Sequence, residues 1–91
     1  MQKEISTTEF FRCPEFTLIS TLVYLGFSIE ALEPDPKIPG KIIAIFRRRE
    51  ELDKTLELFW SRQIKVEPIS YWETVREVKG RIRSVTEQSN Y

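Results

Sequence analysis

The chain has 91 residues, of which 41% are hydrophobic and 31% charged, which is typical of one globular domain and too short for two. Its 14 Lys and Arg residues balance its 14 Asp and Glu residues, so it lacks the basic excess of most domains that rely on phosphate contacts. Histidine is absent, which removes the commonest general base and the commonest transition-metal ligand. We therefore expect one compact domain over residues 1–91, with loose ends at residues 1–7 and 88–91, and no enzymatic activity.

The first predicted elements are a short strand and a helix. Residues 8–13 have the β-branched and aromatic content of a strand. Pro14 suits the first turn of a helix. Apolar side chains then recur at three- and four-residue steps, at Phe16, Ile19, Leu22 and Val23. Gly26 stands where a C-terminal cap belongs, and the alternation from residue 27 to 31 predicts a half-buried strand.

The longest run of β-branched and aromatic residues, 41–46, predicts the central strand of a sheet, because a strand buried on both faces is apolar at every position. The proline-rich segment 34–40 predicts a stiff loop, so this strand should form an antiparallel hairpin with residues 27–31. A second helix should begin at Glu50, where acidic residues favour a helix start. Its apolar face comprises Leu52, Leu56, Phe59 and Trp60.

The last helix is predicted from a capping box and a long apolar stripe. Ser70 is the expected N-cap, because Pro68 disfavours helix before it, and Glu73 is its partner in the box. The stripe comprises Tyr71, Val75, Val78, Ile82 and Val85. Gly80 leaves two alternatives, a helix that ends at Lys79 or a continuous helix, and the unbroken phase of the stripe favours the continuous one.

This order of elements, β-α-β-β-α-α, predicts an α+β fold in which helices pack against a small three-stranded sheet, mixed or antiparallel. A right-handed crossover makes the first strand parallel to the second. The simplest sheet places the third strand between the other two and antiparallel to both, where its continuous apolar run belongs.

Several of these segments also resemble a known family. They are Pro14-Glu15-Phe16, Leu25-Gly26-Phe27, Ile45-Phe46, Val66-Glu67-Pro68, Tyr71 and Lys79. Over most of residues 8–83 this pattern is similar to a family of small bacterial and phage proteins described as domain of unknown function 5659. The resemblance implies a compact α+β domain of prokaryotic or phage origin, and it implies no activity.

Two groups of cations are candidate nucleic-acid contacts. The first comprises Arg47, Arg48 and Arg49 at the end of the central strand, where forked guanidinium donors would grip phosphate oxygens. We favour the alternative that this run is a solvated strand end, because three acidic residues between positions 50 and 53 cancel its charge locally.

The second group comprises Arg76, Lys79 and Arg83 on one side of the last helix. With Tyr71 and Trp72 nearby, these residues would combine cations with stacking surfaces for a nucleic-acid strand. We favour the alternative that this is the solvated face of an amphipathic helix, in which neighbouring glutamates pair with the cations.

Aromatic and apolar residues are candidates for protein contact. Trp60 continues the stripe of its helix, so we expect it in the core. Trp72 lies off the stripe of the last helix, which leaves both a core position and a partner anchor open for it. Ile82 and Val85 lie beyond Gly80, where we expect the helix to overhang the small core and to support a weak homodimer about a two-fold axis.

The remaining candidates indicate no metal, cofactor or catalytic site. Glu30, Glu33 and Asp35 lack the ligand count and the glycine of a calcium loop, so we interpret them as part of a solvated turn. Cys13 has no histidine to activate it and should be a buried thiol. A single cysteine forms no intramolecular disulfide, and the polar first residues have no secretory pattern, so we expect a cytoplasmic protein without membrane contact.

We interpret the chain as a small non-enzymatic accessory or interaction domain, whose partner is another protein or a second copy of itself. The alternative is a nucleic-acid-binding module that uses Arg47–Arg49 and the basic face of the last helix. This alternative is supported by the chain after Gly40, which carries 11 basic and 8 acidic residues.

Overall fold

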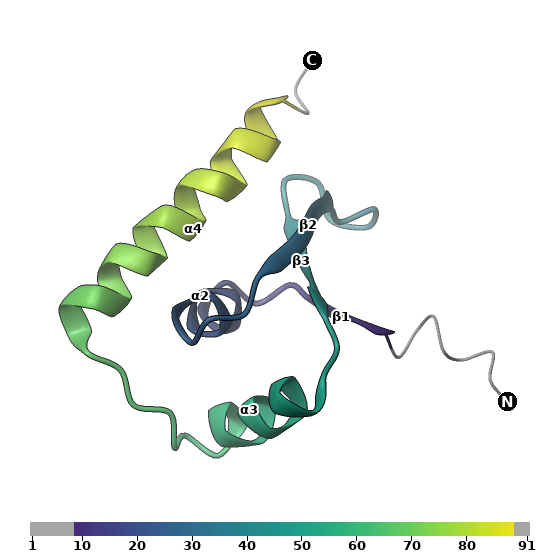
Figure 1. The fold of residues 1–91 in the computed structure, drawn as a ribbon. Helices are drawn as coiled ribbons and strands as arrows, with labels where there is room; N and C mark the ends of the chain where they lie inside the picture. The colour runs from purple at the N-terminus through teal and green to yellow at the C-terminus, as the bar shows by residue number, and fades with distance from the viewer. Residues whose placement is uncertain (1–8, 89–91) are drawn as a thin grey trace, which may run out of the picture.

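The structure, a computed structural model, describes residues 9–88 and arranges them in the predicted order (Figure 1). The elements are β1 (Phe10–Cys13), α2 (Phe16–Tyr24), β2 (Ile29–Pro34), β3 (Ile42–Arg47), α3 (Glu50–Trp60) and α4 (Pro68–Gln88). The α+β class is therefore confirmed. The ends that we expected to be loose lie outside the described residues, apart from Gln88, the last residue of α4.

The sheet has the strand order β1-β3-β2, and β3 runs antiparallel to both of its neighbours. In register, Ile45 lies opposite Arg12 of β1 and Ala31 of β2. Because β3 is hydrogen-bonded along both edges, its backbone polar groups are satisfied without water, and the run from Ile42 to Phe46 is buried throughout. The continuous apolar run thus forms the central strand, as predicted.

Strand β2 extends further than its sequence indicates. It continues through Pro34, which lies opposite Ile42, whereas we expected the strand to end near residue 31. Proline is tolerated because β2 is an edge strand, where half of the backbone N–H groups point away from the sheet. The N–H of Asp35 then donates to the Lys41 carbonyl at 2.8 Å, which closes the hairpin.

One face of the sheet carries the core. Cys13, Ala44 and Phe46 are fully buried there, and each of the three helices contributes buried side chains to the same cluster. These side chains are Leu18, Ile19 and Leu22 of α2, Leu52 of α3 and Val78 of α4. The three helices therefore lie on one side of the sheet, and α4 packs against α2 (Figure 1).

The other face of the sheet is covered by side chains instead of a helix within residues 9–88. Ile43 and Ile45 point to this face, because side chains alternate along a strand, yet both are less than a tenth exposed. Arg12 of β1 and Glu33 of β2 stand on either side of β3, and their side chains meet at 3.2 Å, Nη1 to Oε1. Because β3 lies between the two strands, the side chains of Arg12 and Glu33 meet above it. Their hydrocarbon stems shield the apolar side chains of β3 from water, as the stems of long charged residues commonly do.

Helix α2 is buried on two sides, because the sheet packs against one side and α4 packs against another. Its buried residues run without interruption from Leu18 to Leu22. The helix ends at Gly26, the predicted cap, which has a φ of 103°. The N–H groups of Gly26 and Phe27 donate to the carbonyls of Val23 and Leu22, at 3.0 and 2.9 Å respectively. This Schellman arrangement requires a positive φ, which glycine adopts without strain.

We expect Phe46→Ala to remove much of the folding stability. Phe46 is fully buried in the core cluster, and truncation of a buried Phe costs about 3–5 kcal/mol, against a total of roughly 5–13 kcal/mol for a chain of this size. Urea unfolding followed by circular dichroism measures the change. The control Ile38→Ala, at a half-exposed loop position, should cost less than about 0.5 kcal/mol, and equal losses in the two variants would contradict this description of the core.

Removal of the Ser20 hydroxyl and removal of the Thr21 hydroxyl should change the stability of the fold in opposite directions. Ser20 Oγ is buried and has no hydrogen-bond partner within residues 9–88. Thr21 Oγ1 donates to the Thr17 carbonyl at 2.8 Å and lies 3.1 Å from the Tyr71 hydroxyl. Ser20→Ala should therefore stabilise the fold by about 1 kcal/mol, and Thr21→Val should destabilise it by about 1 kcal/mol. Urea unfolding compares them, and a loss of stability in Ser20→Ala would refute the assignment of an unpartnered hydroxyl.

Candidate functional site

The N-terminus of α4 is capped by Glu67, so the predicted capping box of Ser70 and Glu73 is wrong. The Glu67 carboxylate accepts hydrogen bonds from the N–H groups of Ile69 and Ser70, at 3.2 and 2.7 Å. These bonds, led by those to Ser70, lower the pKa of Glu67 below its usual value. Pro68 occupies the first helical position, where its missing N–H costs nothing, so it starts the helix and does not block it.

A polar seam fixes α4 against α2. The backbone N–H of Glu67 donates to the Tyr24 hydroxyl at 3.0 Å, and the Tyr24 and Tyr71 rings meet edge to face at 5.5 Å. The Thr21 hydroxyl donates to the Thr17 carbonyl at 2.8 Å, and the Tyr71 hydroxyl lies within hydrogen-bond distance of both groups, 3.1 Å from Thr21 Oγ1 and 3.4 Å from the Thr17 carbonyl oxygen. Hydrogen bonds are directional, so this seam sets the rotation of α4 about its axis.

One exposed flank of α4, about 100° around the helix from the buried Val75 and Val78, carries an aromatic residue and three cations. The helix is continuous through Gly80, as predicted, and it buries Val75 and Val78. Four exposed residues fall on one flank, and we name them the basic stripe: Trp72, Arg76, Lys79 and Arg83. At 3.6 residues per turn they lie within an arc of about 60°. The stripe therefore presents one aromatic ring and three positive charges in the same direction.

The cations of the basic stripe are not neutralised by neighbouring glutamates. The alternative that we favoured from the sequence is a solvated helix face with local pairing to Glu73 and Glu77, and the exposure of the three cations agrees with a solvated face. Within residues 9–88, however, Arg76, Lys79 and Arg83 form no ion pair. The positive charge of the stripe is available to an outside ligand.

Arg47 and Arg48, in contrast, are engaged in ion pairs. Arg47 Nε lies 3.9 Å from Glu30 Oε2, and Arg48 Nε donates to Asp53 Oδ1 at 3.1 Å. Both pairs are solvent-exposed, so each contributes little to stability, but each occupies a guanidinium that a phosphate would need. These ion pairs agree with our expectation that acidic residues cancel the charge of the arginine run.

All three guanidinium groups of Arg47–Arg49 also lie over phenylalanine rings. The pairs are Arg47 with Phe10, Arg48 with Phe11 and Arg49 with Phe27, at 5.1, 6.0 and 5.4 Å from the ring centroids. Such contacts hold the start of β1 and the approach to β2 against the end of β3. The run stands at the far end of β3 from the second half of α4, which lies beside Lys41 and Ile42. The structure therefore does not join the two predicted groups of cations into one surface.

A second candidate surface is apolar. Of the large hydrophobic side chains exposed within residues 9–88, most fall at the end of α3, in the α3–α4 connection and at the start of α4. They are Leu58, Trp60, Val66, Ile69 and Trp72, which follow one another along the chain from the end of α3 to the start of α4, and we name them together the 58–72 apolar surface. Ile69 and Val66 were not among the residues that we singled out from the sequence. The signal that could have found Ile69 is its position three residues before Trp72, on the same off-stripe side of the helix.

The expectation that Trp60 lies in the core is wrong, because Trp60 is 62% exposed. Leu52 is fully buried, and Leu56 and Phe59 pack against the cluster, so the inward arc of α3 is complete without Trp60. Trp60 packs its ring only edge to face on Phe59, at 5.0 Å. Trp72, which the sequence left open, is 57% exposed.

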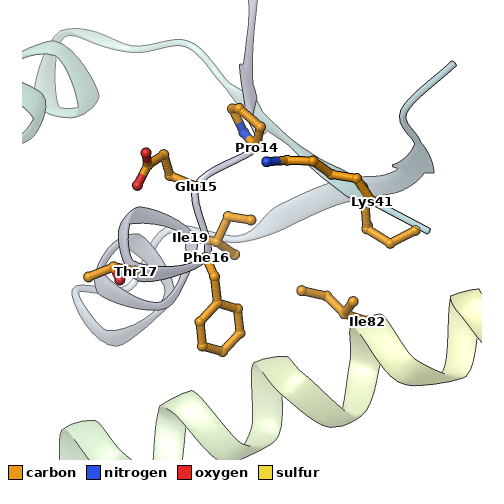
Figure 2. A pocket seen from close by; sticks show the side chains of 8 residues that line it. Pro14, Glu15, Phe16, Thr17, Ile19, Lys41 and Ile82 are labelled. Atoms are coloured by element: carbon orange, nitrogen blue, oxygen red, sulfur yellow. The ribbon is translucent and has the colours of Figure 1, made fainter. Parts of the chain in front are cut away.

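A groove of about 490 Å³ lies between the starts of α2 and β3 and the second half of α4 (Figure 2). The side chains of Phe16 and Ile82 point into the space between the two helices (Figure 2). Ile82 also packs against the core cluster, so this part of α4 does not overhang the core as we expected, and Val85 is half-buried. A weak homodimer through Ile82 and Val85 stays a prediction.

The remaining candidate residues are occupied within the fold. Glu33 and Glu30 pair with arginines, and Asp35 Oδ1 accepts the Lys37 N–H at 2.8 Å. Cys13 is buried, as predicted, and this burial raises the pKa of its thiol to about 11, so the thiol stays protonated. Within residues 9–88 no group of three or more cysteine or carboxylate side chains could hold a metal ion, and no helix is long and apolar enough to cross a membrane.

No family model, curated protein or solved structure matches the chain. The resemblance to domain of unknown function 5659 therefore stays a prediction. Function is inferred from the two surfaces of this chain, the basic stripe and the 58–72 apolar surface.

The start of α4 should lose stability as the pH falls below about 4.5. Because folding lowers the pKa of Glu67, the unfolded chain binds the proton more readily, so the stabilising effect is complete above the unfolded pKa and disappears as the pH falls through the folded one. Wild type should have a higher melting temperature than the Glu67→Gln variant at about pH 6, and the difference between the two melting temperatures should narrow towards about pH 3. The amide chemical shift of Ser70, followed by NMR in the folded protein, should titrate at the lowered pKa of Glu67. A difference in melting temperature that stays constant with pH would contradict the assignment of the Glu67 carboxylate as the N-terminal cap of α4.

Proposed function

We propose that the protein is a non-enzymatic interaction domain that binds another protein through the 58–72 apolar surface. The observation that carries the proposal is the exposure of Trp60 and Trp72, the only tryptophans in the chain. The buried core cluster contains Phe46 and includes neither tryptophan ring. Apolar area removed from water contributes about 25 cal/mol per Å², and tryptophan is enriched among the residues that dominate binding energy at interfaces.

The 58–72 apolar surface is held in position at both of its ends. Helix α3 ends with Arg62 at a φ of 64°, and the N–H groups of Arg62 and Gln63 donate to the carbonyls of the last turn, at 3.1 and 2.9 Å. Helix α4 begins at the Glu67 cap, which is tied to Tyr24 of α2. A surface that is ordered before binding loses less conformational entropy on binding, and this favours specific recognition.

The absence of histidine from the chain and the protonated, buried Cys13 support a role without catalysis. A cytoplasmic location is part of the proposal and is supported by the single cysteine, which is typical of chains that fold under reducing conditions. A prokaryotic or phage origin is also part of it, and rests on the resemblance to domain of unknown function 5659.

Site-specific photo-crosslinking tests this proposal. A benzophenone amino acid placed at Trp60 or at Ile69 should capture one protein partner in cells that encode the chain, and the same probe at Ile38, which is also exposed, should not capture it. The purified partner should then bind Trp60→Ala about 30-fold more weakly than wild type, the effect of losing a residue that dominates an interface. Because Trp60 is mostly exposed, the substitution should lower the unfolding free energy by only about 1 kcal/mol or less.

Three results would overturn the proposal. Equal capture from Ile38 and Trp60 would show that the contact is unspecific. Undiminished affinity of Trp60→Ala for the captured protein would show that the partner binds elsewhere. Capture of a second copy of the chain would replace the proposal with self-association.

A further inference from the structure

The basic stripe combines two kinds of binding group on one rigid element. Arg76, Lys79 and Arg83 form no ion pair within residues 9–88, and Trp72 is 57% exposed at the head of the stripe. With a rise of 1.5 Å per residue, the stripe spans about 16 Å from Trp72 to Arg83. The seam with α2 holds this flank of α4 in the solvent.

We propose that the basic stripe binds single-stranded nucleic acid, with its cations on successive phosphates and a base stacked on Trp72. Cations along a track neutralise phosphates whatever the base sequence, and an exposed aromatic ring offers a stacking platform for an unpaired base. The charge complementarity is local, since the chain as a whole has no net charge.

The single strand is favoured over a duplex because of Trp72. The bases of a duplex are stacked on one another and offer no free ring face, so a duplex would use only the cations of the stripe. An acidic chain without aromatic side chains, such as polyglutamate, would likewise use only the cations. Trp72 belongs to both surfaces, whereas Arg76, Lys79 and Arg83 lie outside the 58–72 apolar surface. The proposal therefore goes beyond the proposed function, and the charge-reversal test of the cations does not depend on it.

Charge-reversal variants with a matched control test the site. Arg81 is also exposed on α4, but it lies about 140° around the helix from Arg76. Arg76→Glu and Arg81→Glu change the net charge equally, so only a contact at the stripe distinguishes them. In fluorescence anisotropy with a labelled oligothymidylate of about 15 nucleotides at low salt, Arg76→Glu and Arg83→Glu should each bind at least about 10-fold more weakly, and Arg81→Glu should stay within about 2-fold of wild type.

The salt dependence and the tryptophan signal test the two halves of the stripe separately. Three phosphate contacts predict a slope of about −2 for log affinity against log salt, and each charge reversal should make the slope shallower. The Trp60→Phe variant leaves Trp72 as the only tryptophan, and oligothymidylate should quench its emission. A duplex of the same length and polyglutamate should bind more weakly and leave that emission unchanged.

Several outcomes would overturn the proposal. These are no binding by wild type at low salt, equal losses in Arg81→Glu and Arg76→Glu, and binding of duplex or polyglutamate as tight as that of the single strand. Binding without quenching of Trp72 would also overturn it, because it would remove the stacked base. The substituted side chains are exposed, so thermal melts within about 2 °C of wild type confirm that each variant is folded.

Discussion

Phe46 of β3 packs against α2 at the centre of the core, and the positions of the two outer helices depend on this contact. The sheet has only three strands, and α2 packs directly on it. Helix α4 therefore packs mainly against α2, and α3 contributes the fully buried Leu52 to the same cluster. A helix with neighbours on one side leaves the rest of its circumference in water. Both candidate surfaces of the protein lie on these outer helices or on the connection between them.

The rotation of α4 about its axis decides which of its side chains face outward. Val75 and Val78 provide apolar contact, but apolar contact is not directional and would tolerate some rotation. The bonds between Tyr71 and Thr21 and from the Glu67 backbone to Tyr24 are directional and permit one orientation. The same polar seam that secures α4 thus places the basic stripe on an exposed flank of the helix.

The sequence by itself determined the features that depend on local chemistry. The apolar run at 41–46 specified the central strand, because five consecutive side chains are buried only where both faces of a strand are covered, which is typical of the middle of a sheet. Gly26 specified the end of α2, because the backbone there needs a positive φ. The unbroken stripe specified one helix through Gly80, since the burial of Val78 and Ile82 outweighs the modest cost of a helical glycine.

Only the tertiary structure decided which side chains are exposed and which charges are paired. Trp60 fits the stripe of α3 by spacing, yet the small core is complete without it. Helical periodicity shows which residues share a face of the helix, but it does not show how many of them the core has room for. Arg47 and Arg76 belong to equally basic segments, but Arg47 has Glu30 and Phe10 beside it, brought from strands distant in the chain. The flank of α4 that holds Arg76 has no such neighbour within residues 9–88. Charge is local in sequence, but its neutralisation depends on contacts that only folding creates.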